Sequence, residues 1–217
     1  MKKIKIKIMD IKSEIIEAFE ENKRIFQIII ILFTLGLIIS WIFADKIAPF
    51  FLPILQESLL EDNALSLDAL NILYHNLSSA LITLLLSVFF GIYPLLTAFL
   101  NGFAVGFLGG YIVKTPETLI LFLVLIIPHG IIEIPAIFCE CTSGVLLFLF
   151  IFRIIKDKIS GFSFKEAYEN NKKNIKHAVV LFLISVLLFI IAAFIEGFIT
   201  PFLGNLISMQ LIGTPLF

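Results

Sequence analysis

The sequence predicts an all-α membrane protein, a polytopic transmembrane helical bundle of about five membrane segments. Of the 217 residues, 59% are hydrophobic and only 15% are charged, whereas soluble domains average roughly 25% charged residues. The mean hydropathy is +1.06, so the chain carries more apolar surface than a soluble fold can bury. We therefore expect a single membrane domain over residues 25–217, preceded by a cytoplasmic amphipathic segment over residues 1–24.

The charges are clustered, although the net charge is only -1. Seven of the 16 basic residues precede the first apolar run, and seven more lie in a loop over residues 153–177. Basic loops stay in the cytoplasm under the positive-inside rule, which predicts a multi-pass protein of the cell membrane with a cytoplasmic N-terminus, a cytoplasmic loop 153–177 and an outside C-terminus. Nucleic-acid binding is the alternative for basic patches, but the flanking apolar runs favour membrane lipid as the partner, with no nucleic acid.

The first crossing follows directly from the N-terminal segment. Residues 1–24 place large apolar side chains at helical spacing between lysines and glutamates, which is typical of a helix lying on the inner membrane surface. Residues 25–43 carry no charge and are long enough to cross a hydrocarbon core of about 30 Å. Trp41 near the far end suits the aromatic belt of the opposite interface.

The next part of the chain is expected to return across the membrane. Residues 45–73 hold several acids and two prolines and are expected to form an outer loop with a short helix. Residues 74–100 are uncharged and are expected to cross as one helix. The glycine-rich segment 101–113 follows, and it is too short to cross as a helix at 1.5 Å per residue. Its small residues predict close helix packing or a re-entrant element; the candidate packing glycines, with one further along the chain, are Gly102, Gly106, Gly110 and Gly130.

A clear break separates this segment from the next apolar run. Thr115 or its neighbour can cap a helix that begins at Pro116. Residues 118–152 are longer than one comfortable span, so we expect them to turn. Pro128-His129-Gly130 is the expected place and Pro135 the second, because proline removes a backbone donor and glycine loosens the chain.

The number of crossings is limited by parity. An even number must separate the N-terminus from the loop 153–177 if both are cytoplasmic. The region 101–152 can therefore contain one or two re-entrant hairpins or an additional pair of full crossings. For residues 118–152 we favour the additional pair, a broken pair of uneven helices, over a hairpin. Residues 178–199 then cross once more, and the side of the membrane that holds Lys114 stays open.

Four ionisable side chains fall within the apolar runs, where a charge costs roughly 2.5–3.5 kcal/mol on insertion scales and so needs a partner or a purpose. They are His129, Glu133, Glu140 and Glu196. His129 and Glu133 are four residues apart and share a helix face unless Gly130 breaks the helix. We expect a polar cluster of His129, Glu133 and Glu196 supported by Asn101.

Three interpretations of this polar cluster stay open. It can be a hydrogen-bonded network that fixes helix packing, to which His75 and Asn76 are further candidates. It can bind a divalent metal such as zinc through His129, Glu133 and Glu196, although the spacing lacks the second histidine of metalloproteases. It can also carry protons or a solute, or supply a catalytic acid at Glu133.

Other enzyme signatures are weak, and we name no catalytic residue. Ser143 lacks the first glycine of a nucleophile elbow. Cys139 and Cys141 are expected to be small buried packing residues, because side chains two apart on a helix point about 200° apart and cannot easily form a disulfide. The glycine-rich segment lacks the lysine ending of a phosphate loop.

One stretch resembles a known family. Residues 127–137, with the pattern His-Gly-x-x-Glu-x-Pro-Ala, resemble the most distinctive part of the stage II sporulation protein M family of polytopic membrane proteins. The Asn101-Gly102 pair with Gly106 resembles that family's Asn-Gly segment, and residues 192–201 resemble its final-helix ending. The resemblance implies a membrane scaffold, which in spore-forming bacteria acts with partner proteins that remodel peptidoglycan during engulfment. Residues 138–142 depart from the family with an additional acid and two thiols, which favours metal binding.

The sequence thus predicts a non-enzymatic membrane scaffold or assembly factor of this type. We expect a homo-oligomer that self-associates through its glycine-lined faces and holds other membrane or cell-envelope proteins. The alternative is a metal-dependent membrane enzyme, a hydrolase, or a small-solute or ion transporter that uses the same cluster.

Overall fold

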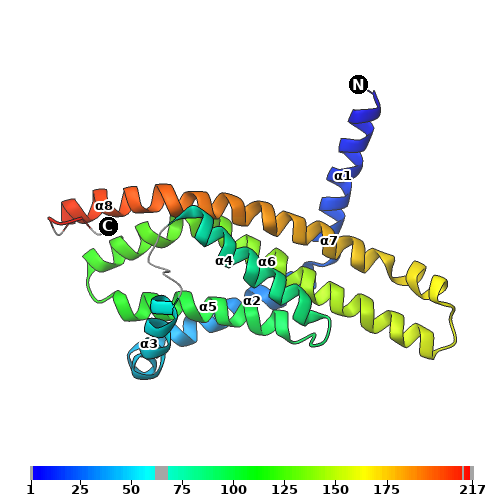
Figure 1. The fold of residues 1–217 in the computed structure, drawn as a ribbon, viewed down its shortest axis with the longest axis horizontal. Helices are drawn as coiled ribbons and strands as arrows, with labels where there is room; N and C mark the ends of the chain where they lie inside the picture. Colours follow the sequence, from blue (N-terminus) through cyan, green and yellow to red (C-terminus); the bar gives the residue numbers. More distant parts are fainter. Residues whose placement is uncertain (1, 62–67, 212, 216–217) are drawn as a thin grey trace.

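A computed structural model describes residues 2–61, 68–211 and 213–215, and in this part of the chain the secondary structure is helical without strands (Figure 1). The elements are α1 (Lys2–Glu21), α2 (Lys23–Ile42), α3 (Ala44–Glu61), α4 (Ala69–Ser87), α5 (Tyr93–Ile112), α6 (Pro116–Ile159), α7 (Phe164–Phe194), the π-helix η1 (Ile195–Ile199) and α8 (Thr200–Leu211). Among the described residues, five helices are long and apolar enough to cross a membrane, namely α2, α4, α5, α6 and the continuous α7–η1–α8. The predicted all-α bundle of five membrane segments is therefore confirmed.

The α1 helix stands apart from the bundle and points away from it (Figure 1). Its side chains Ile11, Ile16 and Phe19 are exposed, whereas Ala18 is fully buried against the bundle. A helix with one apolar exposed face and one anchored face suits the surface of a membrane, as the sequence predicts for this segment.

Glycines let α2 and α5 approach each other backbone to backbone. A Cβ atom on Gly102 would overlap the backbone of Phe33, and one on Gly106 would overlap the backbone of Leu37. Gly110 lies in the same way against Trp41. These three glycines therefore serve helix packing within the chain. Their face is covered by α2.

Gly130 differs from the other three predicted packing glycines. A Cβ atom there would meet only Ile126 and Ile134 of its own helix, at 3.5 and 3.9 Å. Gly130 instead lines an open apolar groove of about 320 Å³ on α6. It does not mediate a close approach between helices within this chain, in contrast to the other three glycines.

The predicted single crossing over residues 74–100 is wrong. The α4 helix ends at Ser87, and the chain turns before α5 begins at Tyr93. Pro94 stands in the first turn of α5, where a backbone N–H has no partner within the helix, so proline is tolerated there. The turn also places Gly91 directly under the ring of Phe148. Consequently the segment 101–113 is the second half of a full-length crossing helix rather than a short re-entrant element.

The α6 helix contradicts the turn predicted at Pro128-His129-Gly130. One helix of 44 residues runs through this motif and through Pro135. It changes direction part-way along (Figure 1), as expected where prolines bend a membrane helix and neighbouring groups satisfy the freed carbonyls. The expected start is confirmed, because Thr115 caps the helix and accepts a hydrogen bond from the Thr118 N–H at 3.3 Å. The pair of crossings predicted within 118–152 is therefore wrong, because this region is one helix. The two helices that follow α4 and can cross the membrane are α5 and α6.

The predicted loops are largely helical. Residues 45–73 contain α3, which includes two prolines, while residues 62–67 lie outside the described residues. In the predicted loop 153–177, α6 continues to Ile159 and α7 begins at Phe164. The last crossing, predicted over 178–199, is part of a helix that is continuous to Leu211.

Two ion pairs show which helix ends lie together. The Lys114 Nζ atom, just past α5, lies 2.8 Å from Asp45 at the start of α3. At the opposite end of the bundle, Lys173 of α7 lies 2.5 Å from Glu17 of α1. The C-terminal part of α1 and the α6–α7 connection therefore share one end of the bundle, which we call the hairpin end, and Lys114 lies at the other.

Candidate functional site

Three of the four predicted cluster residues meet where α6 and η1 pack together. The Nε2 atom of His129 lies 3.8 Å from a carboxylate oxygen of Glu133. One ligating atom each of His129, Glu133 and Glu196 lies within 4.8 Å of the other two. His129 is only 8% exposed. The three residues therefore form one compact group, which we call the His–Glu cluster.

The local backbone explains how these side chains converge. Because α6 is unbroken at Gly130, His129 and Glu133 stand one helical turn apart on the same face. Glu196 lies in η1, a π-helical turn that widens the last crossing, and such insertions occur frequently at functional sites. A Cβ atom on Gly197 would overlap the backbone of Ala69, so this glycine lets the start of α4 reach the same place.

Two polar residues complete the surroundings of the His–Glu cluster. The Nδ1 atom of His129 lies 3.4 Å from the hydroxyl of Thr200, which is buried. Asn76 of α4 faces the Glu133 carboxyl, yet its buried Nδ2 atom makes no hydrogen bond of standard geometry within the described residues. The sequence named Asn76 as a candidate but missed Thr200, whose only signal was its place one helical turn after Glu196.

The other sequence candidates lie elsewhere. The amide of Asn101 donates to the carbonyl of Thr97 on its own helix at 2.9 Å. The structure thus does not bring Asn101 into the His–Glu cluster. His75 is exposed on α4.

Glu140 is a second buried acid on α6, two helical turns beyond Glu133. It is 3% exposed, it faces Thr83 of α4, and one of its oxygens has no hydrogen bond in the part of the chain that is described. The neighbouring Cys139 and Cys141 are buried free thiols, as predicted.

The charge of the His–Glu cluster is uncompensated by lysine or arginine. Every Lys–Glu or Lys–Asp ion pair found among the described residues lies at the hairpin end or at Lys114. Within the part of the chain that the structure describes, Glu133 has only His129 as an ionisable partner within ion-pair distance, and no such pair forms at Glu196. Two carboxylates and an imidazole in this arrangement can hold protons or a divalent cation.

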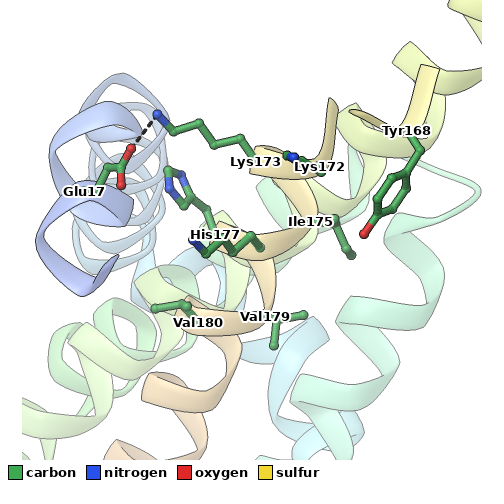
Figure 2. Close-up of a pocket in the computed structure, with 9 residues that line it drawn as sticks. Glu17, Tyr168, Lys172, Lys173, Ile175, His177, Val179 and Val180 are labelled. Carbon is green, nitrogen blue, oxygen red and sulfur yellow. Dashed lines mark ion pairs between the residues drawn. The ribbon is translucent and has the colours of Figure 1, made fainter. Parts of the chain in front are cut away.

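A second polar region lies at the hairpin end, where α1 is fastened to α7. Lys173 contacts both Glu17 and Glu21, and Lys176 contacts Glu14. Figure 2 shows Lys173 reaching across to Glu17 beside a pocket of about 570 Å³, which is lined mainly by α7 side chains. The Lys173 ammonium, which hydrogen-bonds to Glu17, holds the pKa of that carboxyl below its ordinary value.

The far tip of the α6–α7 hairpin exposes large apolar side chains. Ile159 is 82% exposed and Phe164 is 65% exposed. We call the following residues the hairpin tip: Phe152, Ile155, Ile159, Phe162 and Phe164. Sequence analysis missed this surface, because its apolar residues alternate with lysines and look like the end of a membrane span.

Comparison with known proteins agrees with the fold and the motifs. The family model for stage II sporulation protein M matches residues 29–201. An uncharacterized protein of Methanocaldococcus jannaschii is 38% identical over 131 residues, which cover 60% of this chain and 70% of that protein. A second uncharacterized protein of the same organism is 27% identical over 206 residues, which cover 89% of this chain and 88% of that protein.

No solved structure matches the chain. The family match, in contrast, extends from within α2 to the first turn of α8, and so includes both His129 and Glu196. With five helices able to span a membrane and this match over most of its length, the chain belongs to the stage II sporulation protein M family.

Proposed function

We propose that this chain is a non-enzymatic membrane scaffold or assembly factor that holds a partner protein at its hairpin tip. The observation that supports the proposal is the exposure of large apolar side chains on a helical hairpin beyond the ends of the shorter crossings. Apolar patches outside the membrane mark sites of protein association.

Helix length supports an extramembrane position for the tip. At 1.5 Å per residue, the 44 residues of α6 extend about 66 Å, whereas a hydrocarbon core is about 30 Å thick. Phe148 of α6 packs over Gly91 in the turn between α4 and α5, which marks the level where the shorter helices end. The tip residue Ile159 follows eleven residues later, about 17 Å further along the helix.

The charges around the tip indicate what kind of partner would fit. Basic side chains alternate with the apolar ones: Arg153, Lys156, Lys158 and Lys165. We therefore expect a protein partner that has an apolar patch with an acidic rim. The positive-inside rule predicts that this end faces the cytoplasm. The sequence resemblance also implies a scaffold role.

Site-specific photo-crosslinking in cells tests the proposal. A crosslinking amino acid at Ile159 or Phe164 is expected to capture one defined protein, and Leu187, exposed on the membrane-spanning part of α7, serves as the control position. The double substitution Ile159→Asp and Phe164→Asp should abolish co-purification of the captured protein without loss of the chain from the membrane. Capture of lipid alone at both tip positions, or unchanged co-purification, would rule the proposal out, whereas capture of a second copy would identify self-association.

A further inference from the structure

We propose that His129, Glu133 and Glu196 form a binding site for one divalent transition-metal ion of the zinc class inside the helical bundle. This site goes beyond the scaffold function and does not depend on it. Imidazole and carboxylate are ordinary zinc ligands, and a set of three leaves a fourth position open.

The spacing of the donor atoms fits an ion between them better than direct hydrogen bonds. The 3.8 Å between His129 Nε2 and the Glu133 oxygen exceeds hydrogen-bonding distance. Ligand atoms of a tetrahedral zinc ion lie about 3.3–3.5 Å apart, given bonds of about 2.0–2.1 Å. The present separations, all within 4.8 Å, would reach those values if the two flexible glutamate side chains rotated toward the ion.

The orientation of His129 is a second, independent observation. The residue is buried, with 8% of its surface exposed, and its Nδ1 atom lies beside the Thr200 hydroxyl. The Nε2 atom lies on the side of the Glu133 carboxylate, and no hydrogen bond to Nε2 occurs among the described residues. One ring nitrogen of His129 also lies within 4.8 Å of a Glu196 oxygen. Metal-ligating histidines typically use one ring nitrogen for the ion and the other for an orienting neighbour.

Charge balance gives a third reason. Two ionised carboxylates at membrane depth repel each other and need a compensating cation. Lysine and arginine do not supply it within the described part of the chain. A divalent ion would neutralise both carboxylates at once, and the π-helical turn at Glu196 brings the third donor to it. Protonation of both glutamates would also remove the repulsion between them. The experiment below distinguishes a bound ion from bound protons.

Glu140 offers a matched control. It is a buried carboxylate on the same helix and lacks a basic partner among the described ion pairs, but it lies outside the His–Glu cluster. A general effect of removing a buried negative charge would appear equally in Glu140→Gln and Glu196→Gln. Loss of metal is expected only in the second.

The experiment uses the full chain purified in detergent micelles, stripped with a chelator and titrated with Zn²⁺ and with Co²⁺. We expect about one ion per chain by elemental analysis and a visible Co²⁺ spectrum typical of low coordination number. Glu133→Gln and Glu196→Gln should each weaken binding at least about tenfold, whereas Glu140→Gln should bind as the wild type does. Gel filtration and circular dichroism check that each variant is folded, and Thr200→Val, which removes only the orienting hydroxyl, should give a smaller loss.

Two results would overturn the proposal. One is a folded wild-type chain that binds less than a stoichiometric amount of either ion. The other is binding that survives Glu196→Gln but is lost in Glu17→Gln, since Glu17, Glu21 and His177 form another group of possible ligands. Lys173 already pairs with both of those glutamates, so we expect Glu17→Gln to leave the ion in place.

Discussion

Gly102 on α5 lies directly against the backbone of Phe33 on α2, with no room between them for a methyl group. The same relationship recurs one turn later between Gly106 and Leu37. Inside lipid, helix association depends on this kind of close packing, because lipid tails are as apolar as the helix surfaces. The α2–α5 pair is therefore a structural unit of the chain itself.

Replacing Gly102 should separate this pair. We expect Gly102→Leu to destabilise the folded state by about 3 kcal/mol or more, because backbone atoms rather than a flexible side chain occupy the space. Unfolding of the purified chain by heat or by increasing denaturing detergent measures the change. Gly130→Ala is the matched control, since its Cβ would meet only side chains of its own helix. It should be neutral or stabilise by up to about 1 kcal/mol through helix propensity, and equal damage by both variants would contradict the packing role.

The link between α1 and α7 should depend on Lys173. We expect Lys173→Ala to release α1, because this one ammonium pairs with both Glu17 and Glu21. Spin labels at the exposed Glu20 and Asn170 positions would report a broader and longer distance distribution. Lys172→Ala is the control, since Lys172 pairs with Glu169 on its own helix. A distribution that stays narrow in Lys173→Ala would show that the remaining contacts, the Lys176–Glu14 ion pair and the burial of Ala18, are enough to hold α1.

The same link should respond to acid in a defined range. Lys173 lowers the pKa of Glu17 below the ordinary value of 4.5. Ionised Glu17 therefore favours the docked helix above pH 4.5, and this contribution is lost as the pH falls through the lowered pKa. Spin-label distances measured from pH 7 to pH 3 should stay constant down to about pH 4.5 and lengthen below it. Lengthening that begins near pH 6 would instead implicate His177, which also faces Glu17.

The corrected order of crossings can be tested by cysteine labelling. We expect Thr115→Cys to react with an impermeant maleimide in intact cells, and Phe90→Cys and Lys165→Cys to react only after the membrane is opened. Phe90 is exposed in the turn between α4 and α5, whereas one helix over 74–100 would place it in lipid. The native thiols of Cys139 and Cys141 are buried and should not react with the maleimide. Labelling of Lys165→Cys from outside would reverse the orientation, and an unreactive Phe90→Cys would argue against the turn.

Some boundaries could have been predicted better from the sequence. Gly91 and Pro94 mark the turn after α4. The sequence is apolar on both sides of them, so the hydropathy pattern predicts one helix where the structure has two. At Pro128 and Gly130 the opposite error occurs, because the sequence predicts a turn where the helix is continuous. Both residues are typical of a helix break in water, yet a membrane helix continues through them because its other backbone groups have no water to bond.

The sequence by itself determined the membrane class, the helical fold, the capped start of α6 and the expectation that His129 and Glu133 share a helix face. These properties follow from composition, from local propensity and from the 3.6-residue period, which act within a few residues. Only the tertiary structure decided that Glu196 and Thr200 reach His129 while Asn101 does not. That outcome depends on a π-helical turn and on the close approach of Gly197 to Ala69, and the packing of helices far apart in the chain is not encoded in local periodicity.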